Sequence, residues 1–468
     1  MVNRRLQTFE KSGQNGSFIA TAMLLGVTFI LGGSSRADYV PSIVVLALSA
    51  GYVGALLPFY RWREFRPIAV PLGLLSGMFL LCLLQLVPVP GWYGRPMFAA
   101  TGVMAGIPPN WRPVSLSPVS TWSVWATLFV PLAALITLIR LPPTGRRFVV
   151  PFLLAAALVS ALLGVVQGLS GADSVLYYYE FTNRGSPVGV FANRNHQAVF
   201  LACGVVWAAY IFCNTPSQLS QARAVRWTAV GMSLVLFSCV LVNASRAGLM
   251  ALCLASVFAF MLFICRSTSS VVKSGVSSHP SWAGGWRSVA LSGVAAVGLA
   301  CPFVLFFFQS RIPALDRLLS NESRFGLRGD VTPTLIDMAG RNIPWGTGMG
   351  TFERAYRMVE PNSLLTPSYL NNAHNDWVQL LIELGLPAVL LLCCALGWIG
   401  MRLVHLWRSG GDSGRFALCS GGTLAILAMA SLVDYPLRTP WMMVVAALLI
   451  GLLGFKIPDR KFAGRDLR

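Results

Sequence analysis

The sequence predicts an all-α polytopic membrane protein with about twelve transmembrane helices. Of its 468 residues, 55% are hydrophobic and only 11% are charged, whereas soluble domains carry about 25% charged residues. The apolar runs are each roughly 20 residues long, the length of helix that crosses about 30 Å of hydrocarbon. Helices are expected rather than strands, because backbone groups inside lipid must find their hydrogen bonds within the same segment.

The apolar runs give the expected order of the chain. The first run is typical of a signal anchor, because no convincing small-residue cleavage site follows it. We expect spans near residues 17–33, 39–59, 67–89, 119–140, 147–168, 193–214, 226–243, 246–265, 287–308, 374–401, 415–433 and 438–456. They group into N-terminal helices (1–145), a core with a large outer loop at 309–373 (146–440), and a last helix with a basic tail (441–468).

Lysine and arginine predict the side that each loop faces. An even number of spans puts both termini on one side, and every short loop on that side is basic, so we expect that side to be cytoplasmic. The net charge of +19 follows from this topology, and no nucleic-acid partner is needed to explain it. The ten cysteines lie in or near apolar runs without metal-ligand spacing, which favours a packing role.

Two motifs on the expected outer side begin apolar helices with an arginine. In the first, Asn193 or Asn195 can cap the helix, and Arg194 lies beside its free N–H groups, an arrangement that suits an anion. In the second, Arg246 stands where a span begins, and an arginine there is costly without a partner or water. In both motifs the alternative to a functional site is an arginine whose side chain only extends to the membrane–water interface. His196 is less favoured as a functional histidine.

The large outer loop carries the next candidates. Arg324 and Arg328 precede Thr332-Pro333, which predicts a short helix starting there. The glycine-rich segment 344–350 is not a dinucleotide fingerprint, because no strand precedes it. We expect it to be a flexible turn in close backbone contact with another segment. Loops of this length without a function are uncommon.

The end of that loop supplies a candidate base. His374 comes just before an apolar helix, followed by Asn375 and Asp376. An imidazole accepts protons near neutral pH and can activate a hydroxyl nucleophile; the alternative is an interfacial capping histidine. Between the last two spans, we expect Asp434 and Arg438 to pair and fix the hairpin.

Together these motifs predict arginines, helix N-termini and one base on the outer face. Arginine pairs bidentately with phosphate oxygens, so the pattern suits a lipid-linked phosphate or pyrophosphate. No acidic cluster that would hold Mg²⁺ or Mn²⁺ is apparent, and arginine would then neutralise a departing pyrophosphate. No cofactor is expected.

At these residues the sequence resembles the O-antigen ligase / O-antigen polymerase superfamily of bacterial envelope proteins. The resemblance is carried by Gly189–Asn195, Ser245–Gly248, Arg324 with the 346–350 turn, and the run from His374 to Gly385. It extends in pattern over roughly residues 150 to 440. The first four spans match only in hydropathy.

The resemblance implies a metal-independent, inverting glycosyltransferase of the GT-C kind in the bacterial inner membrane. Its donor would be a glycan on undecaprenyl pyrophosphate at the periplasmic face, and its acceptor another glycan or lipid A-core. His374 would be the base, Arg246 and Arg324 would bind the pyrophosphate, and Arg194 or Arg184 would assist. Ligase and polymerase remain open.

A membrane transporter or flippase for a lipid-linked glycan or small anion is the rival hypothesis. Transporters tend to bury ionisable residues in mid-span and to show inverted repeats. This sequence has few charges deep in its spans and no convincing repeat. Charge gathered on one face therefore favours interfacial chemistry, and a non-catalytic assembly scaffold is the third alternative.

Overall fold

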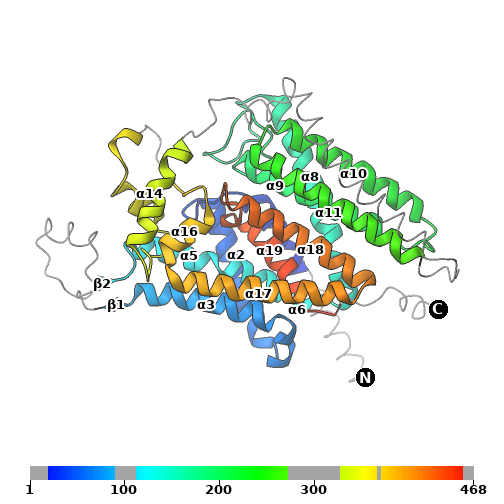
Figure 1. The fold of residues 1–468 in the computed structure, drawn as a ribbon, viewed down its shortest axis with the longest axis horizontal. Coiled ribbons are helices and arrows are strands. Elements are labelled where there is room, and N and C mark those ends of the chain that lie inside the picture. The colour runs from blue at the N-terminus through cyan, green and yellow to red at the C-terminus, as the bar shows by residue number, and fades with distance from the viewer. Residues whose placement is uncertain (1–18, 90–111, 272–326, 366–369, 457–468) are drawn as a thin grey trace, which may run out of the picture. The chain divides into compact units, whose positions relative to one another are not determined.

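The computed structural model describes residues 19–89, 112–271, 327–365 and 370–456 (Figure 1). Within these ranges the regular secondary structure is almost wholly helical. The exception is a pair of two-residue antiparallel strands, β1 (Pro88–Val89) and β2 (Arg112–Pro113), which place Pro88 opposite Pro113. The structure therefore agrees with the all-α class that the composition predicts.

The chain is a multi-pass membrane protein by the length and composition of its helices. Nine helices in the described ranges are long and apolar enough to cross a bilayer: Val40–Phe59, Trp62–Leu86, Pro118–Arg140, Val149–Ser170, Arg194–Asn214, Ala222–Val242, Arg246–Arg266, Leu386–Arg408 and Gly411–Ala430. The first and last expected spans appear as shorter apolar helices, Ile19–Leu31 and Pro440–Leu452. The expected span at 287–308 lies outside the described residues.

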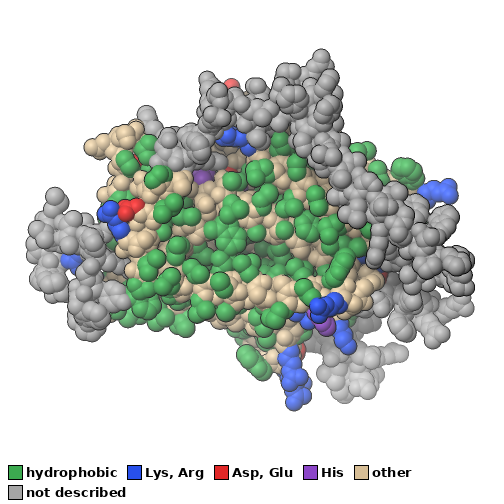
Figure 2. Space-filling model, viewed as in Figure 1, with side chains coloured by type: hydrophobic (Ala, Val, Ile, Leu, Met, Phe, Trp, Pro, Cys, Tyr) green, Lys and Arg blue, Asp and Glu red, His purple; other side chains and the backbone are tan. Residues whose placement is uncertain are grey.

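The surface of these helices fits a lipid environment. Figure 2 shows that the described side chains on one face are mostly apolar, with charged groups near its margins. Leu390 is 67% exposed and Leu162 is 66% exposed, although each stands in a helix that is long enough to span a bilayer. Large apolar side chains left uncovered in this way are expected where lipid replaces water.

The chain forms two compact units, and each is described by itself. Unit 1 contains residues 1–140, 324–398 and 431–451, and unit 2 contains 141–323, 399–430 and 452–468. These are units of packing. The division at residues 145 and 440 expected from the sequence stays a prediction.

Unit 1 is built from the N-terminal helices and the segments around His374. Its elements are Ile19–Leu31, α2 (Val40–Leu56), η1 (Leu57–Phe59), η2 (Trp62–Ile68), α3 (Ala69–Leu86), α5 (Pro118–Thr127), α6 (Phe129–Arg140), α14 (Leu327–Arg341), α15 (Phe352–Arg357), η6 (Asn362–Leu364), α16 (Asp376–Leu384), η7 (Pro436–Arg438), most of α19 (Pro440–Leu452) and the first half of α17 (Leu386–Arg408). Buried hydroxyls join three of these helices, since the Tyr52 hydroxyl lies 2.8 Å from that of Thr21 and 3.2 Å from that of Thr137.

The glycine-rich segment 344–350 packs its backbone against the end of α16. The amide of Thr347 donates to the Ile382 carbonyl (2.8 Å), and that of Gly348 donates to the Glu383 carbonyl (2.9 Å). Gln85 of α3 holds both segments, because its amide nitrogen donates to the Glu383 carbonyl and its oxygen accepts from the Met349 amide. The expected close backbone contact of this turn is thus confirmed, and its partner is α16.

The expected single span at 374–401 is wrong in one respect, because the helix is interrupted. Gly385 has φ 65° and separates α16 from α17. A side chain at Gly385 would overlap the Pro344 carbonyl, which also accepts from the Leu386 amide at 2.8 Å. His374 therefore precedes a nine-residue helix, and the candidate membrane span starts only at Leu386.

Replacing Gly385 with alanine is expected to destabilise unit 1. The positive φ of Gly385 is unfavourable for a residue with a side chain. The added methyl group would also have to displace the Pro344 backbone. We expect a loss of at least about 1 kcal/mol in the free energy of unfolding, measured by thermal unfolding in detergent. Gly397→Ala is the control, since its added methyl group meets open space; equal stability of both variants would contradict the tight packing.

A second sequence expectation needs correction in the large loop. Pro333 was expected at the first turn of a helix, but α14 begins at Leu327 and contains Pro333 in its interior. The helix survives a missing amide donor because its inner face is anchored. Val331, Leu335 and Met338 are buried in a cluster with Phe352 and Ile382, so tertiary packing outweighs the local penalty.

Unit 2 is a helix cluster centred on α9 (Arg194–Asn214). Around it pack α8 (Val149–Ser170), α10 (Ala222–Val242), α11 (Arg246–Val271) and α18 (Gly411–Ala430). The remaining elements are α7 (Pro143–Arg146) and the second half of α17. A side chain at Gly248 would overlap Ala198, so glycine allows α11 to approach α9 closely.

Candidate functional site

His374 is held in a strained backbone conformation at the entry to α16. Its φ is 51°, which is uncommon for a residue with a side chain and is found often at functional sites. Asn375 follows as the N-cap of α16, and its side-chain oxygen accepts from the Val378 amide. The cap fixes where the helix begins, and thereby fixes the position of the imidazole just before it.

Asp434 is the partner of the His374 ring. The ring Nδ1 lies 3.3 Å from Asp434 Oδ1, the Asp434 side chain is 1% exposed and that of His374 is 18% exposed. Asp434 Oδ1 also accepts from the Tyr435 amide at 3.0 Å. When Nδ1 carries the proton and donates to this carboxylate, Nε2 is left as a proton acceptor. This is the orientation that a general base requires.

Arg438 contacts two carboxylates of α16, which differs from the expected pairing with Asp434. Its Nε lies 2.7 Å from Asp376 Oδ1, and its NH2 lies 3.4 Å from Glu383 Oε2. Helix periodicity explains how Arg438 can contact both carboxylates. Asp376 and Glu383 are two turns apart on one face of α16, and one guanidinium in η7 reaches both. Asp434 is thereby available to His374.

The charge balance keeps Arg438 ionised. Burial alone would lower the pKa of Arg438, but the carboxylates of Glu383 and Asp376 outweigh that effect and raise the pKa above its usual value. Glu383 is fully buried and accepts two further hydrogen bonds, from the Gln379 amide nitrogen (3.0 Å) and the Phe352 backbone amide (3.2 Å). The buried oxygens of Glu383 are thus supplied with hydrogen-bond partners, as buried polar groups require.

Gln379 connects this cluster to the segment just before His374. Its side-chain oxygen accepts from the Ala373 amide (2.8 Å), and its nitrogen donates to Asn372 Oδ1 (3.1 Å). The polar side of α16 therefore holds residues 372–373 in place. Both neighbours of His374 along the chain, Ala373 and Asn375, are fixed by hydrogen bonds.

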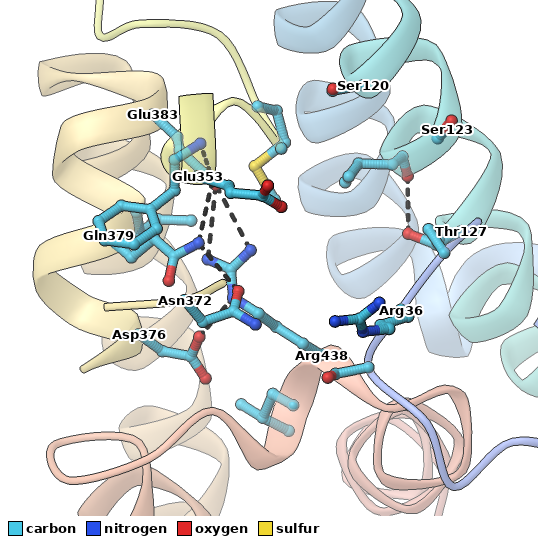
Figure 3. Close-up of a pocket in the computed structure, with 18 of the residues that line it drawn as sticks. Arg36, Ser120, Ser123, Thr127, Glu353, Asn372, Asp376, Gln379, Glu383 and Arg438 are labelled. Atoms are coloured by element: carbon cyan, nitrogen blue, oxygen red, sulfur yellow. Dashed lines mark hydrogen bonds and ion pairs between the residues drawn. The ribbon is translucent and has the colours of Figure 1, made fainter. Parts of the chain in front are cut away.

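These groups border a cavity of about 690 Å³ within unit 1 (Figure 3). One wall is the polar side of α16 with Arg438, and the opposite wall is α5 with Ser120, Ser123 and Thr127. Arg36, from the segment after the helix Ile19–Leu31, reaches the space between these walls. His374 is not among the lining residues, but Asn372 and Asp376 on either side of it are.

Unit 2 brings the two arginine-bearing helix starts together. Asn193 caps α9 by accepting from the Asn195 amide at 2.8 Å, as expected. Asn195 Oδ1 in turn accepts from the hydroxyl of Ser245 (2.8 Å), which precedes α11. Arg194 and Arg246 are the first residues of α9 and α11. Two helix N-termini with an arginine at each suit an anion.

The remaining arginines of the expected donor site have different surroundings. Arg246 is exposed. Arg184 donates to the Ala172 carbonyl at 3.3 Å and lies in the loop before α9. Arg324 lies outside the described residues, and the backbone of Arg328 is in α14 while its side chain is not described. The structure therefore joins Arg194 and Arg246 in unit 2, and His374, Asn375, Asp376, Asp434 and Arg438 in unit 1.

Sequence reasoning missed Glu383, Gln379 and the α5 hydroxyls. A signal was present for the first two. Asp376, Gln379 and Glu383 recur at helical spacing in an otherwise apolar run, and an acid within such a run marks a partnered or functional site. The α5 serines carry no comparable signal, because serine is common in apolar helices and only the fold places them beside a cavity.

One known protein family matches part of this chain. Residues 231–393 match the O-antigen ligase family (Wzy_C). This match supports the resemblance of the chain to the O-antigen ligase/polymerase superfamily. No curated protein matches the chain. The matched segment includes Arg246, Arg324, Arg328, His374, Asn375 and Asp376.

The matched family consists, in general, of enzymes of the ligase or polymerase type. Their substrates are, in general, a lipid-linked glycan and a glycan acceptor. The matched segment spans parts of both units and ends within α17. Asp434 and Arg438 follow it, so the residues that hold His374 and Asp376 in this structure lie beyond the match.

Proposed function

We propose that this protein, whose residues 231–393 match the O-antigen ligase family, transfers a glycan from undecaprenyl pyrophosphate to an acceptor hydroxyl. The observation that carries the proposal is the His374–Asp434 pair at 3.3 Å, in which a buried carboxylate orients an imidazole. Such a pair is the usual device for drawing a proton from a hydroxyl group. The matched family accounts for the class of substrate.

The proposed step begins when His374 Nε2 takes the proton of the acceptor hydroxyl. The acceptor oxygen forms a bond to the anomeric carbon of the donor glycan as the bond from that carbon to the pyrophosphate oxygen breaks. Undecaprenyl pyrophosphate leaves, and the configuration at the anomeric carbon is inverted. Asp434 stabilises the imidazolium that forms, because a carboxylate next to a protonated ring lowers its energy.

The donor's pyrophosphate is assigned to arginine. Arg194 and Arg246 stand at two joined helix N-termini, where backbone N–H groups and the helix dipoles favour negative charge. Arg324 is proposed to join them, with Arg184 and Arg328 as further candidates. Permanently charged guanidinium groups would balance the charge of the leaving pyrophosphate, and we propose that the reaction proceeds without a metal ion.

The proposed location is the bacterial inner membrane with both termini in the cytoplasm and His374 on the periplasmic side. The support is the basic character of every short loop on the expected inner side. A GT-C-like arrangement with one large periplasmic loop at 309–373 belongs to the same proposal. The lipid-linked donor would then meet its acceptor at the outer leaflet.

A deletion strain tests the proposed function and separates its two forms. Loss of a polymerase should leave lipopolysaccharide core capped with a single repeat unit. Loss of a ligase should leave uncapped core while lipid-linked polymer accumulates. An unchanged profile of lipopolysaccharide and exopolysaccharide on gels would rule out both forms.

Replacing Arg246 with lysine should weaken donor binding. Lysine keeps the charge but loses the bidentate geometry, and a hydrogen bond to a charged group is worth about 1.5–3 kcal/mol. We therefore expect kcat/KM for the donor to fall by about 10- to 100-fold. The matched control is Arg223→Lys, at an exposed arginine near the start of α10; equal activity of both variants would remove Arg246 from the donor site.

A further inference from the structure

The cavity of about 690 Å³ in unit 1 has the size of a ligand-binding site. Pockets of about 300–1,000 Å³ enclose ligands of drug size, the class to which a disaccharide belongs. We infer that this cavity binds the acceptor saccharide, an inference that rests on the proposed glycosyltransferase function. The argument comes from the two facing walls of the cavity (Figure 3) and from the apolar part of its lining.

The wall formed by α16 and the segment just before it offers a hydrogen-bond donor to the cavity. Asn372 is 8% exposed. Its oxygen accepts from Gln379 at 3.1 Å, but its amide nitrogen has no partner among the described residues. This nitrogen is not among the buried side-chain atoms that lack a partner, so it remains accessible, and it belongs to a cavity-lining side chain. A hydroxyl group of a bound ligand would satisfy it.

The opposite wall on α5 offers acceptors. Ser120, Ser123 and Thr127 line the cavity at helical spacing, so they lie along one face of the helix. The Ser123 hydroxyl donates to the Val119 carbonyl (3.0 Å), and the Thr127 hydroxyl donates to the Val124 carbonyl (2.7 Å). Because their protons are engaged, both oxygens present lone pairs to other groups. Sugar hydroxyls both donate and accept, and so match a donor wall facing an acceptor wall.

The third part of the lining is apolar and aromatic. Trp377 and Leu380 from α16 and Val119 from α5 also border the cavity. A sugar ring presents C–H groups on its faces and hydroxyls around its edge, and an indole ring can cover such a face while polar groups meet the edge. The lining thus suits a ring that is apolar on its faces and polar at its rim.

Charge argues against the donor's pyrophosphate as the occupant. The lining carries three arginines and four carboxylates: Arg36, Arg354, Arg438, Asp38, Glu353, Asp376 and Glu383. Arg438 is already engaged by Asp376 and Glu383, and Glu353 pairs with Arg357 at 2.8 Å. A site for a multiply charged anion needs net positive charge, whereas a neutral, hydroxyl-rich ligand does not.

Filling the cavity tests the assignment. Ser123→Trp would occupy the space between α5 and α16, and Ser76→Trp places the same side chain at an exposed serine of α3 outside the lining. The purified full-length protein is reconstituted in liposomes with lipid-linked glycan donor, and initial rates are measured against two acceptor probes. The probes are lipopolysaccharide core and a repeat-unit oligosaccharide.

We expect Ser123→Trp to raise the KM for the acceptor that the wild type uses by at least tenfold, roughly the 1.4 kcal/mol that one decade represents, with the donor KM unchanged. Ser76→Trp should leave both values unchanged. An unchanged acceptor KM in Ser123→Trp, or a rise confined to the donor KM, would overturn the assignment. The probe that shows the effect identifies whether the acceptor is core or repeat unit.

A smaller change covers the case in which the tryptophan variant does not fold. Asn372→Ala removes the unused donor, and the loss of one neutral hydrogen bond should raise the acceptor KM about 3- to 10-fold. A folded Asn372→Ala protein with the wild-type acceptor KM would also overturn the inference. If transfer is lost in His374→Ala but both cavity variants behave as wild type, the cavity assignment alone fails. If the wild type shows no transfer, the proposed function fails with it.

Discussion

Replacing His374 with alanine is expected to abolish glycan transfer while the protein remains folded. Proton transfer by a positioned base contributes about 10²–10⁴-fold to a rate, and no second imidazole of the described residues is paired with a buried carboxylate as His374 is with Asp434. The rate is measured with purified protein, and folding by its unfolding temperature in detergent. His405→Ala, at an exposed histidine near the end of α17, is the control.

Asp434→Asn separates the orienting role of the carboxylate from its place in the fold. Asparagine has nearly the same shape, but its amide can hold the imidazole in the wrong tautomer, and the corresponding change in serine proteases lowers kcat by about 10⁴. We expect a comparable loss of kcat with little change in acceptor KM. Wild-type kcat in this variant would mean that His374 acts without Asp434, and wild-type rates in His374→Ala would remove the proposed base.

Breaking the buried ion cluster is expected to have the largest effect on stability. Arg438→Met leaves Asp376 and Glu383 without their shared cation, and Glu383 is fully buried. Removing one partner of a buried pair costs about 3–5 kcal/mol, because the remaining charge is uncompensated. We expect a loss of this size in the free energy of unfolding, measured in detergent with a chemical denaturant.

A surface pair in the same unit provides the matched control. Arg341 and Asp337 form an ion pair at 2.8 Å, with side chains 65% and 51% exposed, so Arg341→Met should cost no more than about 1 kcal/mol. Adding Asp376→Asn and Glu383→Gln to Arg438→Met should recover part of the loss, since no unpaired charge then remains. Equal stability of the two single variants would show that the cluster does not hold α16 and η7 together.

The fold class and most of the spans could be predicted from the sequence because both depend on local properties. An apolar run of bilayer length is visible in the order of residues. The break at Gly385 was missed because it depends on a distant segment, whose Pro344 carbonyl occupies the place of a side chain. The continuation of α14 through Pro333 was missed for the same reason. Burial of Val331 and Leu335 outweighs the tendency of proline to begin a helix.

The candidate site could be predicted in its residue types but not in its pairings. His374, Asp376, Asp434 and Arg438 were each identified from their positions at helix ends. Their partners differ from expectation because the geometry of η7 directs Arg438 to α16, more than 50 residues earlier in the chain. The hydrogen bond between Asn195 and Ser245 joins two motifs that the sequence presents as separate. Long-range contacts of this kind leave no local pattern.

Reconstitution of the reaction is the most direct test of the proposed activity. Purified protein in liposomes is supplied with a glycan on undecaprenyl pyrophosphate and an acceptor glycan, and both the glycosylated acceptor and released undecaprenyl pyrophosphate are quantified. We expect equal amounts of the two products from the wild-type protein, with an inverted anomeric linkage, and neither from His374→Ala. Movement of the intact lipid-linked glycan across the bilayer without any new glycosidic bond would contradict a glycosyltransferase and indicate a transporter.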